Sequence, residues 1–309
     1  MLLAVEIGCD PAAGITAART AEQAGFALVT IDDSPTPAPG GAPRIEAGVR
    51  AAYLARRTTD IGIAPTLHVT VTEPFHLATQ LASLDHASLG RAGWVIGADN
   101  SEAAHATIGS RPLSADALRR EVADVVEVAR LLWDSWEDDA VIRDVTTSRF
   151  LDADRVHHVN YTGARFSVTG PLITPRPPQG QVVVLGSDTL GVTGQLDVAL
   201  IAAATLEEIE DRARRAREQG APLVFAELDL GAGEPSHRLR HNGDADGWQA
   251  LLARLDAIVD GVRVHPADLA VDLPHVIAVA GPRRSGKPTL REALGLPRPA
   301  NRFATAGQE

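Results

Sequence analysis

The chain has 309 residues, of which 45% are hydrophobic and 22% charged, and its formal net charge is −11. This is the composition of a globular protein, long enough for one large barrel or two ordinary domains. The negative charge argues against nucleic acid or an anionic membrane as a partner. No apolar run approaches the ~20 residues of a membrane span, and the N-terminus lacks the pattern of a signal peptide. The single cysteine, Cys9, suits a reducing compartment, so we expect a cytoplasmic protein.

Eight short apolar runs predict the strands of a parallel sheet. They are Leu2–Ile7, Phe26–Ile31, Ile61–Val71, Ala92–Ala98, Val182–Leu185, Leu196–Ile201, Pro222–Leu230 and Gly261–His265. Segments with helical spacing alternate with them: Ala12–Ala24, Ile45–Arg57, Pro74–Ser88, Asp116–Trp136, Leu206–Gln219 and Trp248–Asp260. Eight strand–helix steps favour an α/β fold, a closed (β/α)₈ TIM barrel, over an open sheet with a Gly-rich first turn. We predict one domain over residues 1–309.

Two segments depart from this alternation. Residues 139–180 are rich in Gly, Pro and Thr, and they predict a β-hairpin insertion before strand five. Residues from about 276 to 309 are expected to form a C-terminal arm outside the barrel. We also expect Trp133 to be buried, with Asp134 and Ser135 bracing the end of its helix.

A second polar brace is expected where helix Pro74–Ser88 meets strand four. Asp85, His86 and Arg91 lie close together at this junction in the sequence. Substitution of these residues should lower stability rather than abolish ligand binding.

Several stretches resemble the motifs of one protein family. LASLDHASLGRAGW (Leu81–Trp94), LWDSW (Leu132–Trp136) and the segment from Asp152 to Gly180 are similar to parts of the bacterial luciferase-like flavin-dependent monooxygenases. The specific likeness is to the nitrilotriacetate and dibenzothiophene-sulfone monooxygenase branch, and the tail from Thr289 to Arg302 continues it. The chain is identified as a divergent, shortened member of that branch.

The resemblance implies a two-component enzyme. Such an enzyme uses reduced FMN from a separate flavin reductase, together with O₂, to oxidise a small organic substrate. A deazaflavin cofactor is a weaker alternative. A homodimer is also implied.

The resemblance further implies a flavin site where the carboxyl ends of the strands converge. Asp33 and Ser34 follow strand two, and Thr70 follows strand three. Gly186 and Ser187 end strand five, where backbone N–H groups and a hydroxyl would take the FMN phosphate. His68 is the candidate catalytic base, although a histidine that donates to a neighbouring carbonyl would fit the same position.

Other positions depart from the family pattern. Val95 replaces an Asn, Leu118-Arg119 replaces an Arg-Tyr pair, and Asp188 would repel a phosphate unless it points away. These departures keep open a second interpretation, a non-catalytic or regulatory barrel that has lost tight flavin binding. We expect a colourless protein that binds oxidised FMN no tighter than micromolar, and a yellow protein with stoichiometric FMN would favour the monooxygenase interpretation.

Two further motifs are weak. The stretch from Gly281 to Pro288 nearly spells a phosphate-binding loop, but proline stands where a Mg²⁺-binding hydroxyl is required. We interpret it as a basic loop. His157 and His158 lack further ligands at suitable spacing, so no metal site is predicted.

Overall fold

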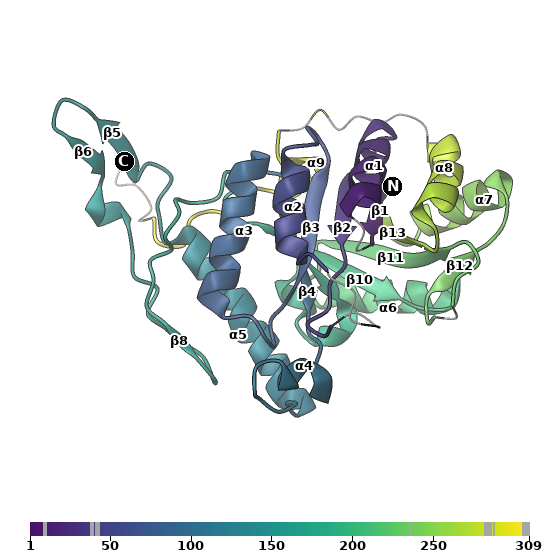
Figure 1. Cartoon of the computed structure of the whole chain (residues 1–309), viewed down its shortest axis with the longest axis horizontal. Helices are drawn as coiled ribbons and strands as arrows, with labels where there is room; N and C mark the ends of the chain where they lie inside the picture. Colours follow the sequence, from purple (N-terminus) through teal and green to yellow (C-terminus); the bar gives the residue numbers. More distant parts are fainter. Residues whose placement is uncertain are drawn as a thin grey trace.

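Eight parallel strands close into a barrel in the computed structural model of the chain (Figure 1). The structure describes residues 1–8, 11–37, 40, 44–234, 236–280, 286 and 288–304. The barrel strands are β1 (Leu2–Ile7), β2 (Leu28–Ile31), β3 (Gly62–His68), β4 (Gly93–Gly97), β9 (Val183–Ser187), β10 (Val198–Ala202), β11 (Leu223–Leu230) and β13 (Gly261–Pro266). The ring closes because β10 pairs with β11 and β13 pairs with β1. The predicted barrel is confirmed.

Helices cover the outside of the barrel. They are α1 (Pro11–Gln23), α2 (Ala47–Ala55), α3 (Pro74–Ser88), α4 (Glu102–Ala106), α5 (Ala115–Asp134), α6 (Leu206–Glu218), α7 (Ala245–Asp256) and α8 (Leu269–Ala280). In α5 the Ser114 side chain caps the first turn, and Trp133 is fully buried as predicted. Two 3₁₀ turns, η3 (Asp188–Leu190) and η4 (Thr193–Gln195), join β9 to β10 in place of a helix. In the described part of the chain, no helix is both long and apolar enough to cross a membrane.

The inside of the barrel changes from apolar to charged along the strands. Residues two apart in a strand share a face, so alternate residues point inward. The inward residues nearer the amino ends form an apolar cluster: Ala4, Leu28, Ala64, Val95, Val183, Leu185, Val198, Leu200 and Phe225. The inward residues that follow are mostly polar: Glu6, Thr30, Thr66, Glu227 and Arg263. We call the carboxyl end of the barrel the mouth.

Two buried carboxylates act as braces, although Asp85 has other partners than the predicted His86 and Arg91. Arg91 instead donates to the carbonyls of Ser88, Ile61 and Ala55. Asp85 accepts the Ala92 N–H at 3.0 Å and the Gln179 side-chain amide at 2.6 Å. Asp134 accepts from the Arg176 guanidinium at 2.8 and 3.0 Å. Burial raises the pKa of both carboxyls, and that of Asp85 reaches about 6. These contacts join α3 and α5 to the strand edges and the insertion.

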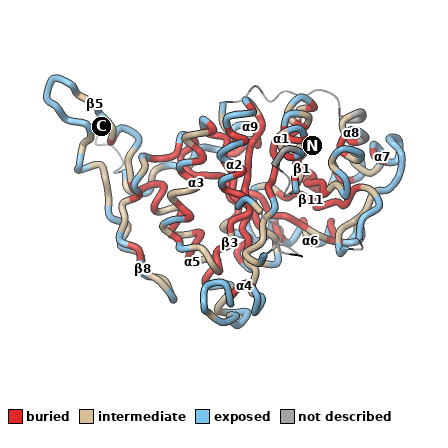
Figure 2. The backbone as a smooth tube through the Cα atoms, viewed as in Figure 1, coloured by how far each residue is buried: buried red, intermediate tan, exposed pale blue. Residues whose placement is uncertain are grey.

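The insertion contains two hairpins where one was predicted. One pairs β5 (Val141–Asp144) with β6 (Arg149–Leu151), and the other pairs β7 (Tyr161–Thr162) with β8 (Ser167–Val168). Both project away from the barrel in Figure 1, and Figure 2 shows that much of their surface is exposed. The Trp136 indole anchors them by donating to the Leu172 carbonyl at 2.8 Å.

The C-terminal arm plugs the amino end of the barrel, which corrects the prediction that it lies outside. The predicted arm also begins too early, because α8 runs to Ala280. The short helix α9 (Leu290–Ala293) inserts Leu290 into the apolar cluster inside the barrel. Arg291 beside it is buried and pairs with Asp197 at 2.9 Å. Beyond α9, Asn301 donates to two carbonyls at the end of α5, so the arm ties the barrel to the insertion.

Cys9 and most of the stretch from Gly281 to Pro288 lie outside the described residues. Their predicted roles are therefore left as predictions.

Candidate functional site

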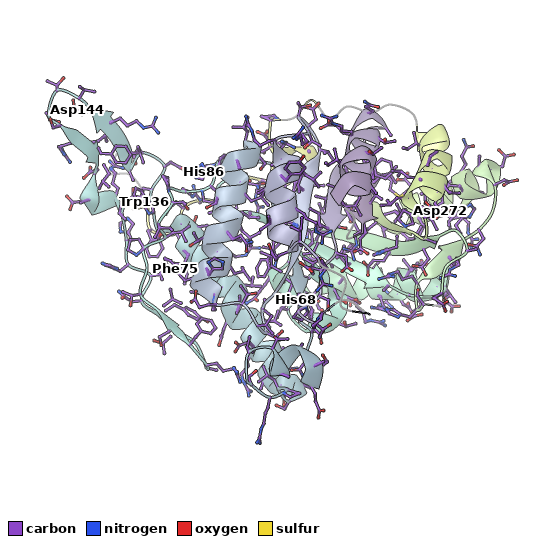
Figure 3. The ribbon with its side chains drawn as sticks, in the orientation of Figure 1. His68, Phe75, His86, Trp136, Asp144 and Asp272 are labelled. Atoms are coloured by element: carbon purple, nitrogen blue, oxygen red, sulfur yellow. The ribbon has the colours of Figure 1, made fainter. Side chains whose placement is uncertain are left out.

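The mouth collects most of the residues predicted from the sequence. Parallel strands bring their carboxyl ends to one rim of the barrel, where the loops after them can share a site. Figure 3 labels His68, which lies at the lower end of the barrel in that view, opposite the end that α9 closes in Figure 1. The environment of each predicted side chain shows which groups remain free to meet a ligand.

Asp33 and Ser34 use their side chains to fold the loop after β2. One Asp33 oxygen accepts the Ser34 N–H at 2.8 Å, and the other accepts the Ala47 N–H at the start of α2 at 2.6 Å. Arg44 also pairs with Asp33 at 2.9 Å. The Ser34 hydroxyl contacts the Thr36 hydroxyl at 2.8 Å. The Asp33 carboxylate is thus saturated by protein donors, and its predicted flavin contact would compete with them.

Both ring nitrogens of His68 are engaged by backbone groups. Nδ1 accepts the Asp99 N–H at 3.3 Å, which leaves the hydrogen on Nε2 to be donated to the Asp33 carbonyl at 3.1 Å. This is the contact that the alternative interpretation of His68 described. Thr70 is similar, since its hydroxyl donates to the Asp99 carbonyl at 2.8 Å. These contacts tie together the loops after β2, β3 and β4, and a catalytic role for His68 stays a prediction.

Ser187 presents a hydroxyl pair at the end of β9. Its Oγ lies 2.8 Å from the Thr189 hydroxyl and accepts the Thr189 N–H at 3.3 Å. Gly186 lies beside it on the opposite face of the strand, where an added Cβ would contact Leu196 and Leu190. Gly186 could therefore offer only backbone groups to a phosphate.

The charge of Asp188 is neutralised inside the protein. Arg212 of α6 donates to both carboxylate oxygens, at 2.9 and 2.5 Å, and also to the Ala202 carbonyl. Because this bidentate pair compensates the carboxylate, Asp188 no longer opposes a phosphate at the end of β9.

Arg119 lies near the same loop. Its side-chain stem packs against Gly191, just beyond Ser187 and Thr189, and its guanidinium pairs with Asp116 at 2.7 Å. Arg119, at a position that departs from the family pattern, therefore packs its stem beside the loop that follows β9.

Sequence reasoning missed a charged cluster that fills the floor of the mouth. Arg263 of β13 pairs with Glu227 of β11 and lies 3.5 Å from Glu6 of β1. His265 contacts Glu6 through Nδ1 at 2.8 Å and Glu227 through Nε2 at 3.2 Å. The available signal was a charged residue at an inward position of an otherwise apolar strand, as in LLAVEI, LVFAELDL and GVRVHP.

The two carboxylates of this floor cluster are kept ionised by their neighbours. Burial alone would raise the pKa of Glu6, but Arg263 and His265 outweigh it and lower that pKa to about 2. Burial opposes ionisation of Glu227 too, yet the same two partners hold its pKa well below the ordinary value.

Asp32 is a further carboxylate close to the floor cluster. It follows β2 with the same parity as Leu28 and Thr30, whose side chains face the barrel interior. No ion pair with a described residue engages its side chain, and the residue keeps exposed surface. Protein atoms around its carboxyl still remove part of its hydration, and together with the nearby Glu6 this raises the pKa of Asp32, which Arg263 only partly offsets. Asp32 is therefore an available acid–base group beside the floor cluster.

Comparison with known proteins gives the context of this site. The family description "Luciferase-like monooxygenase" matches residues 6–223. The chain is 33% identical over 290 residues to a subunit of the pristinamycin IIA synthase of Streptomyces pristinaespiralis, covering 93% of this chain and 90% of that protein. It is 37% identical over 197 residues to N-acetyl-S-(2-succino)cysteine monooxygenase of Bacillus subtilis, where the match covers 62% of this chain and 44% of the relative.

A solved structure shares the fold. The EDTA monooxygenase of Chelativorans sp. BNC1 superposes with a TM-score of 0.82 at 19% identity, covering 96% of this chain and 99% of that one. The sequence match over more than two thirds of the chain and the shared closed barrel lead to one conclusion. The chain belongs to the luciferase-like monooxygenase family.

Proposed function

We propose that the chain is a monooxygenase that uses reduced FMN and O₂ to oxidise a small organic substrate, with a separate flavin reductase as its partner. Family membership supports the flavin, and the available carboxylate of Asp32 in the barrel mouth is the observation that carries the catalytic role. Several relatives are named as monooxygenases of small organic compounds, including nitrilotriacetate and dibenzothiophene sulfone.

The residues at the end of β9 suit the FMN phosphate. Ser187 and Thr189 offer hydroxyls, Arg119 lies near, and Arg212 cancels the charge of Asp188. The loops after β2, β3 and β4 would then surround the flavin ring. Reduced flavin supplies two electrons to O₂, so that one oxygen atom enters the substrate and the other leaves as water.

The chain's own residues have distinct parts in this proposal. Asp32 holds or releases a proton at its carboxyl group, next to the reacting atoms. The floor cluster around Arg263 keeps the base of the site rigid. His68 and Thr70 hold the loops at the rim.

A second candidate function is that of a supporting subunit in a larger enzyme. The relative matched over 90% of its length is itself named as a subunit. In addition, the side chains of Asp33 and His68 are occupied by contacts within the protein. In this role the barrel would dock beside a related barrel that carries the flavin.

A turnover experiment with labelled oxygen separates the two candidates. The purified chain is mixed with FMN, NADH, an unrelated flavin reductase and isotopically labelled O₂, and nitrilotriacetate, dibenzothiophene sulfone and N-acetyl-S-(2-succino)cysteine are each supplied as substrate. A product carrying one labelled oxygen, formed only with the chain present, supports the monooxygenase. No labelled product with the chain alone, but product after a related barrel is added, supports the supporting subunit.

A further inference from the structure

A second cleft lies outside the barrel wall, between α1 and α2. It has a volume of about 440 Å³ and is lined by the ends of β1 and β2 and by the two helices. Its lining is Ile7, Gly8, Gly14, Ile15, Ile31, Ile45, Val49, Arg50, Tyr53 and Leu54. Ile7 and Ile31 follow the inward-facing Glu6 and Thr30, so they point away from the mouth. The cleft is therefore separate from the candidate flavin site, and its volume is in the range of small-molecule pockets.

Arg50 is the one charged residue in the described part of this lining, and it is 5% exposed. Its two terminal nitrogens donate to the carbonyls of Gly8, at 2.8 Å, and Asp32. Its Nε is buried and has no hydrogen-bond partner among the described residues. Among the described residues no carboxylate forms an ion pair with it. Burying a cation in this way is costly unless an anion compensates it.

The other buried arginines of the described chain show how such a charge is usually satisfied. Arg176, Arg263 and Arg291 each pair with at least one carboxylate. Arg91 has no carboxylate partner, but its three nitrogens make five hydrogen bonds to carbonyl and hydroxyl oxygens. Arg50 has neither arrangement, and it alone of the five lines this cleft.

The outer rim of the cleft is apolar and flanked by positive charge. Ile45, Val49 and Tyr53 are 47%, 57% and 47% exposed. The Arg57 guanidinium lies 4.8 Å from the Tyr53 ring centre, although the whole chain is acidic. An apolar channel that ends at a buried cation suits a molecule with an apolar body and an anionic head.

We propose that this cleft binds an aliphatic carboxylate, with its carboxylate on Arg50 and its alkyl chain along Ile15, Ile31 and Val49. The unbonded Nε–H and a neighbouring terminal N–H form the planar donor pair that carboxylates match. Arg50 also donates to the Asp32 carbonyl. A ligand bound to Arg50 would therefore contact a side chain that is hydrogen-bonded to the rim of the mouth.

Isothermal titration calorimetry of the full chain with octanoate measures the dissociation constant and tests this proposal. 1-Octanol is the matched probe that lacks the charge. We expect octanoate to bind at least tenfold more tightly than 1-octanol, and Arg50→Gln to remove that preference. Equal affinity for the two probes would overturn the proposal, as would unchanged octanoate binding by Arg50→Gln.

A second variant keeps the test decisive if Arg50→Gln fails to fold. Gly14 lies in α1 on the cleft wall, where an added Cβ would meet Ile7 at an ordinary 3.5 Å. Gly14→Leu should fill the cleft and abolish octanoate binding, while Gly14→Ala should retain most of it. Octanoate binding that survives Gly14→Leu would contradict the proposal. The proposal would also be contradicted if the wild-type chain bound no octanoate because a second copy covered the cleft. Size-exclusion chromatography would detect such a dimer.

Discussion

Asp32 and Asp33 are neighbours in the chain with opposite surroundings. Asp33 accepts two backbone N–H groups and pairs with Arg44, whereas Asp32 forms no ion pair with a described residue and faces the mouth. An acidic residue at this position was predicted from the sequence to lie near the flavin. The proposed role passes from Asp33 to Asp32, because contacts within the loop occupy the Asp33 carboxylate and leave that of Asp32 available.

Matched substitutions of the pair separate structure from function. Asp33→Asn should lower the free energy of unfolding by about 1–3 kcal/mol, because it disrupts charge-assisted hydrogen bonds in a partly buried loop. Asp32→Asn should leave stability at pH 7 unchanged or slightly higher, since it removes a carboxylate whose ionised form is disfavoured by burial. Urea unfolding measures both values. Equal destabilisation by the two variants would contradict the assignment.

Because of Asp85, the free energy of unfolding should increase as the pH falls towards 5, relative to a variant without this carboxyl. Its folded-state pKa of about 6 exceeds the ordinary value of 3.8, so its contribution to stability is complete below the ordinary value and is lost as pH rises through about 6. Between pH 7.5 and pH 5, the wild type should gain about 1 kcal/mol relative to Asp85→Asn. Unfolding of the two proteins at both pH values gives this difference. A difference that stays constant or changes sign would show that Asp85 titrates normally.

Most of the helices and strands were predicted from the local pattern of apolar residues in the sequence. The strand β1 and the helix α3 have the bounds predicted from the sequence, because apolar spacing and Pro74 mark them clearly. The arm was misplaced for a different reason. Leu290 enters a barrel built by residues up to hundreds of positions earlier, and spacing within the tail carries no information about that contact.

The second hairpin of the insertion was missed because β7 and β8 have only two residues each. Strands this short show no alternation that a sequence pattern could reveal. The floor cluster was overlooked for a related reason. A single Glu or Arg in an apolar run does not show whether it faces solvent or its counter-charge across the barrel.

The plug formed by α9 should contribute strongly to stability. Leu290 is 1% exposed, and its truncation would leave a cavity among Leu28, Gly62 and Gly93. We expect Leu290→Ala to lower the free energy of unfolding by about 2–5 kcal/mol. Val271→Ala, at a site 56% exposed in α8, is the control and should cost less than about 0.5 kcal/mol. An equal effect of the two variants in thermal unfolding would mean that the arm does not close the barrel.

Across the barrel as a whole, the two ends have different tasks. The amino end is filled by apolar residues and sealed by the arm, and the carboxyl end carries the charged floor cluster with Asp32 beside it. This arrangement suits a barrel enzyme, in which residues at the amino end contribute stability and residues at the carboxyl end bind ligands. Family resemblance predicted the location of the site, but the contacts of individual side chains decided which residues remain available.

Binding of reduced FMN by the chain alone is the most direct test of the proposed flavin site. Anaerobic titration with photoreduced FMN should give a dissociation constant of about 1–100 µM for the wild type, weakened several-fold in Ser187→Ala by loss of one hydrogen bond. Ser101→Ala removes a hydroxyl that caps α4 instead and should bind like the wild type. Oxidised FMN should bind no more tightly than reduced FMN, and the purified protein should be colourless. If the folded wild type binds no reduced FMN in this concentration range, or if Ser187→Ala and Ser101→Ala bind equally well, the proposed flavin site at the end of β9 is wrong.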